Sequence, residues 1–245
     1  MSSNEKIDKL KEIVDNSNNI VFFGGAGVST ESGIPDFRSN NGIYNTETEY
    51  GASPEEIISH SYFIKNPEKF YDYYRKNLIF QDAKPNNCHI GLKKLEDLGK
   101  LQAIITQNID GLHQKAGSEN VLELHGSIYR NFCMKCGRPY LIDDVVNCEG
   151  IPRCKCGGMI KPDVVLYEEP LNQAILSFAV DYISTCDTLI VGGTSLIVNP
   201  AATLIQYFKG KDLVIINKDE TPYDSQADVL INDNIGDVFK ELMDL

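Results

Sequence analysis

The chain has 245 residues and 42% of them are hydrophobic, enough for one large domain or for one domain with an insertion. Its 23 Lys and Arg against 35 Asp and Glu give a formal net charge of −12, which disfavours nucleic-acid binding because that binding depends on neutralising phosphates. No apolar run approaches membrane-spanning length and no signal sequence is visible at the amino terminus, so we expect a cytoplasmic protein without membrane contacts.

The first predicted elements are a helix, indicated by apolar spacing over residues 7–14, and a buried strand over residues 20–24. The glycine-rich segment Gly25–Ser39 follows, where an open α/β sheet binds a pyrophosphate. It lacks the third glycine of the dehydrogenase fingerprint, since Thr30 follows Ser29, and no acidic residue closes a strand about 20 residues later. We therefore predict a loop that holds a dinucleotide and carries chemistry in its Asp-Phe-Arg cluster.

Residues 39–88 are rich in Tyr, Asn and charge and show no strand pattern. Within them, residues 53–56 (Ser-Pro-Glu-Glu) have the order of an N-cap, a first helical position and an acidic third position, so we expect a small helical module. A second amphipathic helix begins at His89 and ends at Gly99, and residues 101–105 form the next strand.

The seven cysteines are unevenly distributed, and four of them form two close pairs. The pairs are Cys133-x2-Cys136 and, after 17 intervening residues, Cys154-x-Cys156. Four thiolates so arranged suit a closed, structural zinc site and are hard to explain as unrelated thiols. Because the second pair is unusually tight, Cys148 is an alternative ligand for one position. Residues 126–162, with little apolar periodicity, are then an insertion held by the metal.

Strand patterns return at residues 188–191, which precede two glycines, and at residues 213–216, which precede Asn217. Such short, non-alternating apolar runs are typical of parallel strands buried on both faces, joined by helical crossovers. We therefore predict an α/β fold, with a Rossmann-like doubly wound parallel sheet and a smaller inserted zinc-ribbon and helical module. The expected division is 1–38, 89–125 and 163–245 for the dinucleotide-binding domain, and 39–88 and 126–162 for the small domain.

Polar or glycine clusters follow four of the predicted strands. They are residues 24–39, Thr106–Asp110, Gly192–Ser195, and Asn217 with Asp219. Each alone is compatible with an ordinary turn, but ligands of a doubly wound sheet bind at the carboxyl ends of its strands. The four together predict one site, in which the carboxylate of Asp110 is suited to hold an amide group.

The other clusters can bind other parts of the dinucleotide in the same site. The backbone N–H groups of Ala26 and Gly27 can approach phosphates because little side chain intervenes. Thr194 and Ser195 can bind the other phosphate or a ribose, and Asn217 can hydrogen-bond the ribose hydroxyls of an adenosine.

His125 is the candidate catalytic imidazole. A lone histidine is more often structural, but this one ends the apolar run 121–124 just before the metal-held insertion, where clefts between domains form. His60, His89 and His113 have no such context, and we interpret them as structural.

Taken together, these residues resemble the sirtuin family, and the likeness is nearest to its small bacterial deacetylases. The matching motifs are Gly25–Ser39, Thr106–Asp110, His125-Gly126, the four paired cysteines and Gly193-Thr194-Ser195. The resemblance covers nearly the whole chain. It implies an NAD-dependent protein-lysine deacetylase that transfers the acetyl group from acetyl-lysine to ADP-ribose, releasing nicotinamide and O-acetyl-ADP-ribose. It also implies NAD+ as co-substrate, one structural Zn2+ and acetylated proteins or peptides as partners.

The resemblance further assigns roles to single residues. His125 would be the general base that activates a ribose hydroxyl, with Asn108 as the second catalytic residue. The implied cofactor contacts are Ala26, Gly27, Thr30, Phe37, Arg38, Gln107, Asn108, Ile109, Asp110, His125, Thr194, Ser195, Asn217 and Ile235. Among them, Phe37 would shield the reactive ribose face and Asp110 would hold the carboxamide of nicotinamide.

The run Lys161–Glu169 is similar to the sirtuin segment that pairs with a substrate peptide, although many relatives carry Phe-Gly-Glu where this chain has Tyr167-Glu168-Glu169. The peptide is expected as an added strand between this segment and Ser195–Val198. The implied substrate contacts are Val164, Val165, Leu166 and Tyr167.

One departure from the family bears on the acyl group. Sirtuins that prefer succinyl or malonyl groups share a Tyr-x-x-Arg pair, whose Arg meets the acyl carboxylate. Counted from Pro67, the matching positions are Tyr74 and Asn77, so we expect neutral acyl groups, acetyl first. A one-residue shift of the alignment would bring Arg75 or Lys76 to that position.

Two alternative functions use the same residues. One is mono-ADP-ribosylation of a protein, and the other is a non-catalytic NAD-sensing protein that binds partners through the cysteine module. His125 beside Asn108 and Asp110 disfavours the second. We expect the chain to act as a monomer.

Overall fold

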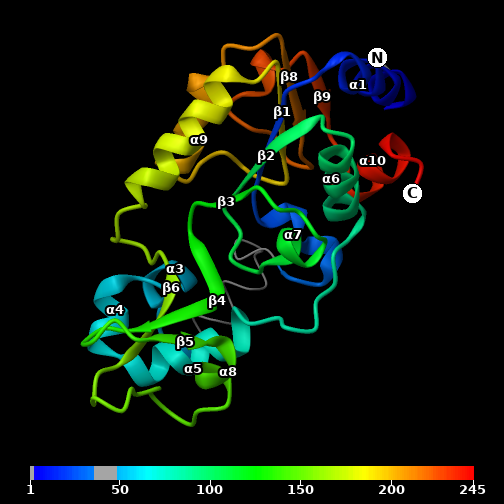
Figure 1. Ribbon diagram of the computed structural model, residues 1–245. Helices are drawn as coiled ribbons and strands as arrows, with labels where there is room; N and C mark the ends of the chain where they lie inside the picture. The colour runs from blue at the N-terminus through cyan, green and yellow to red at the C-terminus, as the bar shows by residue number, and fades with distance from the viewer. Residues whose placement is uncertain (1–2, 36–48) are drawn as a thin grey trace.

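The computed structural model describes residues 3–35 and 49–245 (Figure 1). The predicted contacts Phe37 and Arg38 lie outside the described residues. A parallel six-stranded sheet, in the order β3-β2-β1-β7-β8-β9, forms the centre of the larger part of the molecule. Its strands are β1 (Ile20–Gly24), β2 (Leu101–Thr106), β3 (Val121–Glu123), β7 (Thr188–Gly192), β8 (Asp212–Ile216) and β9 (Val229–Ile231).

The order of the strands confirms the predicted doubly wound fold. The chain adds β2 and β3 on one side of β1, then crosses to add β7, β8 and β9 on the other side. Every residue of β1 and β7 is buried, which explains why their sequences show no alternation. The direction of winding reverses between β1 and β7, and ligands of such sheets bind beyond the carboxyl ends of the strands at that point.

Helices cover both faces of this sheet (Figure 1). One face, which includes Phe22 and Ile190, packs against α1 (Ser3–Asn16), α6 (Asn87–Asp97) and α10 (Ile235–Leu242). The other face, which includes Val21 and Phe23, packs against α9 (Gln173–Thr185) and the 3-10 helix η3 (Ala201–Tyr207). Successive residues of β1 thus supply two separate cores.

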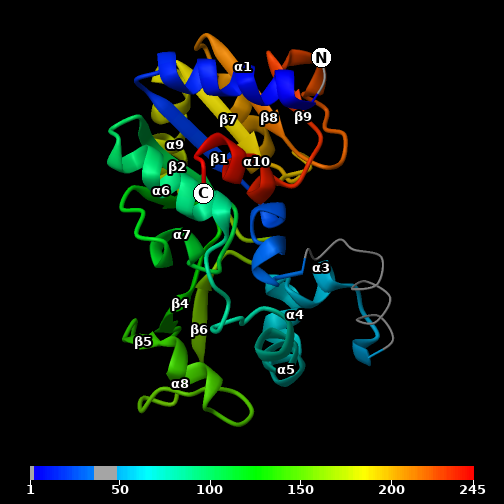
Figure 2. The same ribbon diagram turned by 90° about the vertical axis from the view of Figure 1, so that its right-hand side faces the viewer.

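The smaller lobe combines the two insertions, which lie side by side below the parallel sheet (Figure 2). Its elements are α3 (Pro54–Ile57), α4 (His60–Lys65), α5 (Pro67–Asn77), β4 (Gly126–Cys133), β5 (Pro139–Leu141), α8 (Ile142–Val146) and β6 (Ile160–Val164), whereas α7 (Leu112–Lys115) belongs to the connection between β2 and β3. One core joins them, in which Phe63, Phe70 and Tyr71 from the helices meet Ile128 and Val145 from the zinc module. In residues 49–88 and 126–162, neither insertion therefore has a core separate from the other.

Local signals explain the helices of this lobe. The side chain of Ser53 accepts a hydrogen bond from the N–H of Glu56, as the sequence predicts for a cap, and Pro54 occupies the first helical turn. The antiparallel sheet β5-β4-β6 had no such signal in the sequence. Within residues 3–35 and 49–245, none of the helices has the combination of length and apolar character that a bilayer crossing requires.

Candidate active site

A cavity of about 670 Å³ lies between the carboxyl ends of the parallel strands and the smaller lobe. Apart from Phe37 and Arg38, every residue that the sequence assigned to the cofactor or the peptide lines it. These residues are Ala26, Gly27, Thr30, Gln107, Asn108, Ile109, Asp110, His125, Val164, Val165, Leu166, Tyr167, Thr194, Ser195, Asn217 and Ile235. The structure thus brings segments from the whole chain to one place.

Two glycine loops form the floor of the cavity by packing backbone against backbone. The N–H of Gly27, in the 3-10 helix η1 (Ala26–Val28), donates to the carbonyl oxygen of Gly193 at 2.8 Å. A Cβ atom on Gly27 would lie 2.8 Å from the Cα of Gly193, and Gly193 has a φ of 58°, which favours glycine. Only glycine at both places allows this approach, and it leaves a cradle open at the switch point of the sheet, where a pyrophosphate fits.

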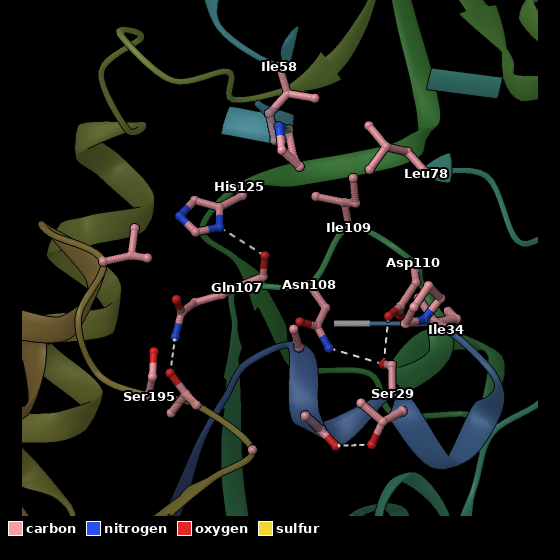
Figure 3. Close-up of a pocket in the computed structure, with 18 of the residues that line it drawn as sticks. Ser29, Ile34, Ile58, Leu78, Gln107, Asn108, Ile109, Asp110, His125 and Ser195 are labelled. Carbon is pink, nitrogen blue, oxygen red and sulfur yellow. Dashed lines mark hydrogen bonds between the residues drawn. The ribbon is translucent and has the colours of Figure 1, made fainter. Parts of the chain in front are cut away.

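Ser29, Asn108 and Asp110 form a hydrogen-bond network in the cavity wall, called the carboxylate network below (Figure 3). The hydroxyl of Ser29 donates to Asp110 Oδ2 at 2.7 Å and accepts from Asn108 Nδ2 at 3.1 Å. Asp110 Oδ1 accepts from the N–H of Leu112 at 2.9 Å, which fixes the carboxylate. Burial raises the pKa of Asp110, although the bond from Ser29 opposes this.

Ser29 is a site residue that sequence reasoning did not single out. It is 1% exposed and follows the glycine loop by two residues. The loop motif contained it, but its link to Asp110 depends on how the loop after β2 approaches η1.

His125 lies beside this network, and one hydrogen bond determines which of its ring nitrogens carries the hydrogen (Figure 3). Its Nδ1 lies 2.9 Å from the carbonyl oxygen of Gln107, which can only accept, so Nδ1 carries the hydrogen. Burial lowers the pKa of His125, so the ring is neutral at neutral pH. Its Nε2 therefore presents a lone pair, as a general base requires.

The three other histidines do not line this cavity. His89 and His113 are buried, with ring centroids 4.7 Å apart, and burial lowers the pKa of both. His60 pairs with Glu169, its Nδ1 2.8 Å from Oε1. These contacts fit the structural interpretation given from the sequence.

The segment from Val164 to Tyr167 forms one rim of the cavity, and several of its backbone N–H groups are hydrogen-bonded within the protein. The N–H of Tyr167 donates to the carbonyl oxygen of Ile58, and that of Val165 donates to the carbonyl oxygen of His125, each at 3.0 Å. The N–H of Leu166 donates to Glu169 Oε2 at 2.9 Å. The carbonyl oxygens of Val164, Leu166 and Tyr167 already accept hydrogen bonds from Lys161 Nζ, the N–H of Glu169 and the N–H of His60. With these N–H groups engaged as well, a peptide strand here would donate its own N–H groups to remaining acceptor positions of the segment.

The four paired cysteines converge at the far end of the smaller lobe. Cys133 Sγ lies 3.5 Å from Cys156 Sγ, Cys136 Sγ lies 3.6 Å from Cys154 Sγ, and all four sulfur atoms lie within 4.8 Å of one another. A tetrahedral zinc with bonds of about 2.3 Å would hold them about 3.8 Å apart, so the set fits one Zn2+.

The surroundings favour a thiolate at Cys154, whereas the side chains of the neighbouring cysteines raise the pKa of Cys156 to about 11 in the absence of a metal. The N–H of Cys156 donates to Cys154 Sγ, and this bond lowers the pKa of Cys154 to about 6. Cys148, the alternative ligand considered from the sequence, is outside the group, and its Sγ contacts the carbonyl oxygen of Glu149 at 3.4 Å.

The two residues of α5 that match the acyl-selecting pair make different contacts. Tyr74 lines the cavity, whereas Asn77 Nδ2 bonds back to the carbonyl oxygen of Tyr73 at 3.1 Å. Arg75 bonds the carbonyl oxygens of Val145 and Gly150 at 2.9 and 2.6 Å. Lys76 pairs with Asp72 and Glu49. A shift of the alignment therefore brings no cation from α5 into the cavity.

Comparisons with known proteins agree with this geometry. A family model described as the Sir2 family matches residues 25–200. Two similar relatives are called NAD-dependent protein deacetylase. The one from Clostridium perfringens is 59% identical over 98% of this chain and 99% of its own length, and the one from Clostridium acetobutylicum is 57% identical over 98% of each.

Solved structures give the same result. A Sir2 variant bound to a deacetylated p53 peptide and 3'-O-acetyl-ADP-ribose superposes with a TM-score of 0.89 at 37% identity, covering 97% of each chain. A complex of a Sir2 homologue with NAD superposes with a TM-score of 0.88 at 38% identity, covering 97% of this chain and 92% of that one.

Proposed function

The chain belongs to the Sir2 family, and from this premise we propose that it is an NAD-dependent protein-lysine deacetylase whose general base is His125. It transfers the acetyl group of acetyl-lysine to ADP-ribose and releases nicotinamide. The assignment of His125 as the general base rests on its tautomer. Hydrogen bonding of Nδ1 to Gln107 directs the lone pair of Nε2 toward the cavity that the carboxylate network and the glycine loops share.

NAD+ bound in this cavity supplies the activated ribose and the departing nicotinamide. The backbone N–H of Ala26 is suited to the phosphates, whereas that of Gly27, which the sequence also assigned to them, already donates to Gly193. Asn217 and Ile235 line the end of the cavity assigned to adenosine. Asp110 is suited to bind the carboxamide of nicotinamide, because its carboxylate can accept a hydrogen bond from the amide N–H group. His125 accepts the proton of a ribose hydroxyl at Nε2, and Asn108 orients that ribose.

The acetyl-lysine enters between Val164–Tyr167 and Ser195–Val198. We propose main-chain pairing of the peptide with this rim, which gives affinity with little sequence preference. A zinc ion held by these four sulfurs would have no open coordination position, so its role would be to hold the small lobe, which supplies one cavity wall. We accordingly propose the small domain to be residues 39–88 and 126–162, supported by the core shared by the described parts of both segments.

We also propose a monomer in the cytoplasm with no nucleic-acid partner. The charge of −12 disfavours nucleic acid, and none of the seven cysteines forms a disulfide, which is typical of a reducing compartment.

The reaction is tested by incubating the protein with NAD+ and an acetyl-lysine peptide and weighing every product. We expect a peptide lighter by one acetyl group, free nicotinamide and O-acetyl-ADP-ribose in equal amounts. A peptide that gains the mass of ADP-ribose would instead identify a mono-ADP-ribosyltransferase. Binding of NAD+ without release of nicotinamide would identify a non-catalytic sensor.

Asp110→Asn tests the carboxamide contact. We expect inhibition by nicotinamide to weaken about tenfold or more, because a charge-assisted hydrogen bond is lost, while NAD+ binding changes less. Inhibition curves and calorimetric titration measure the two effects. Asp219→Asn, at the opposite end of the cavity, is the matched control and should leave nicotinamide inhibition unchanged. Equal loss of both affinities in Asp110→Asn would remove the assigned contact.

A further inference from the structure

Asn86 is hydrogen-bonded both to the start of α6 and to the loop that carries Ser29. It is the N-cap of α6, where its Oδ1 accepts from the N–H of Cys88 at 2.9 Å. Its Nδ2 donates to the carbonyl oxygen of Val28 at 2.7 Å and to the hydroxyl of Ser32 at 3.0 Å. Asn86 itself is not among the described residues that line the cavity.

Capping of the helix does not by itself explain an asparagine at this position. An N-cap needs only a side-chain oxygen, and Asp and Ser serve about as well as Asn. Asn172, the N-cap of α9, acts through its oxygen, since its Oδ1 accepts from the N–H groups of Ala174 and Ile175 at 2.9 and 3.3 Å. At Asn86 the amide nitrogen is engaged as well. An amide meets both needs because it offers an acceptor and a donor on one planar group.

The two acceptors of Asn86 lie on either side of Ser29. Val28 ends η1 and Ser32 ends η2 (Thr30–Ser32), so Asn86 fixes the chain before and after residue 29. Val28 is 0% exposed, so water cannot replace the lost donor at its carbonyl oxygen. Ser29 in turn is the central residue of the carboxylate network (Figure 3). The position of that network therefore depends on Asn86.

Resting on the proposed deacetylase function, we propose that Asn86 is a positioning residue for NAD+ binding. It holds Ser29, and the hydroxyl of Ser29 holds the Asp110 carboxylate that is suited to the carboxamide of nicotinamide. A loop that already has its binding conformation avoids the cost of being ordered when the ligand arrives. Because Asn86 acts through Ser29 and not on the reacting atoms, its loss should weaken NAD+ binding and leave the chemical step unchanged.

Asn86→Asp and Asn86→Ser test this role, because each removes the Nδ2 donor and keeps an oxygen that can cap α6. We expect the KM and the Kd for NAD+ to rise about 5- to 20-fold in both variants, a change that two neutral hydrogen bonds can account for. We expect kcat and the KM for an acetyl-lysine peptide to stay within about twofold, which is the pattern of lost uniform binding. Steady-state kinetics and calorimetric titration with NAD+ measure these quantities.

Asn172→Ala is the matched control, because it removes a helix cap on the other face of the parallel sheet. It should lower the Tm, since a cap is lost, and leave the KM for NAD+ unchanged. With this result, a raised KM in the Asn86 variants cannot be assigned to general destabilisation.

Wild-type affinity for NAD+ in either Asn86 variant would overturn the inference. A fall in kcat at unchanged KM, or a KM for NAD+ that rises equally in Asn172→Ala, would overturn it as well. If the wild type binds NAD+ but turns over no acetyl-lysine peptide, the proposed function fails, while the Kd from calorimetry still decides the inference. If the wild type is active and the Asn86 variants keep its affinity, the inference alone is rejected.

Discussion

His125→Ala is expected to lower kcat for deacetylation by about 10²–10⁴-fold while NAD+ binds within a few-fold of the wild-type affinity. The loss is of the size that a positioned general base contributes. NAD+ binding persists because the phosphate cradle is made by backbone atoms of Gly27 and Gly193 and the carboxylate network by Ser29, Asn108 and Asp110. Steady-state kinetics with an acetyl-lysine peptide and calorimetric titration with NAD+ measure the two quantities.

The pH profile distinguishes loss of a base from loss of a structural contact. In the wild type, kcat/KM falls as the pH drops through the pKa of His125, because a protonated Nε2 no longer accepts a proton. Burial lowers this pKa, so the acid limb lies below the ordinary value of about 6.5 for histidine. His125→Ala should show low activity without this limb. Wild-type turnover in the mutant, or an acid limb that persists in its residual activity, would assign the base to another group.

The parallel sheet could be predicted from the sequence because its signals are local. A buried parallel strand is a short apolar run, and β1, β2, β7 and β8 each begin and end within one residue of such a run. The zinc pairs and the glycine loop are also short motifs with fixed spacing. These features do not depend on what packs against them.

The strands of the smaller lobe could not be predicted in this way. Buried and exposed residues do not alternate strictly along β4, and its register with β6 shifts between Ser127 and Asn131. Its stability depends on helices distant in the sequence and on the four sulfurs, as the shared core indicates. A strand that is stabilised mainly by tertiary contacts shows only a weak pattern in its own sequence.

Some contacts that assemble the site depend on tertiary packing in the same way, although Ile235 itself was among the residues named from the sequence. Ile235 reaches the cavity because α10 is held to η2 (Thr30–Ser32) by one contact, in which the N–H of Gly236 donates to Glu31 Oε2 at 2.7 Å. A Cβ on Gly236 would lie 2.6 Å from the Glu31 carboxylate oxygens, so a larger residue there would require the Glu31 side chain to move. That the Tyr74 hydroxyl has no hydrogen-bond partner among the described residues likewise follows only from the packing of α5.

Cys133→Ser is expected to remove zinc and to unfold the smaller lobe. Zinc binding by four thiolates contributes roughly 10–16 kcal/mol in small zinc domains, and there this free energy is largely folding free energy. A whole protein of ordinary stability has only about 5–15 kcal/mol in total. Cys133 is 1% exposed and belongs to the core shared by both insertions, so its loss affects the helices as well as β4. Metal analysis, circular dichroism and limited proteolysis are the measurements.

Cys148→Ser is the control, because its sulfur lies outside the zinc group although it belongs to the same insertion. It should retain one zinc per chain and the wild-type Tm, and a zinc chelator added to the wild type should reproduce the state of Cys133→Ser. The effect extends to catalysis, since Tyr74 comes from the lobe that the zinc holds and the rim from Val164 to Tyr167 packs against the core of that lobe through Val164 and Leu166. A metal-free Cys133→Ser protein that melts and deacetylates like the wild type would show that the two insertions fold without the metal. In that case, the shared aromatic core would be sufficient to position the peptide rim.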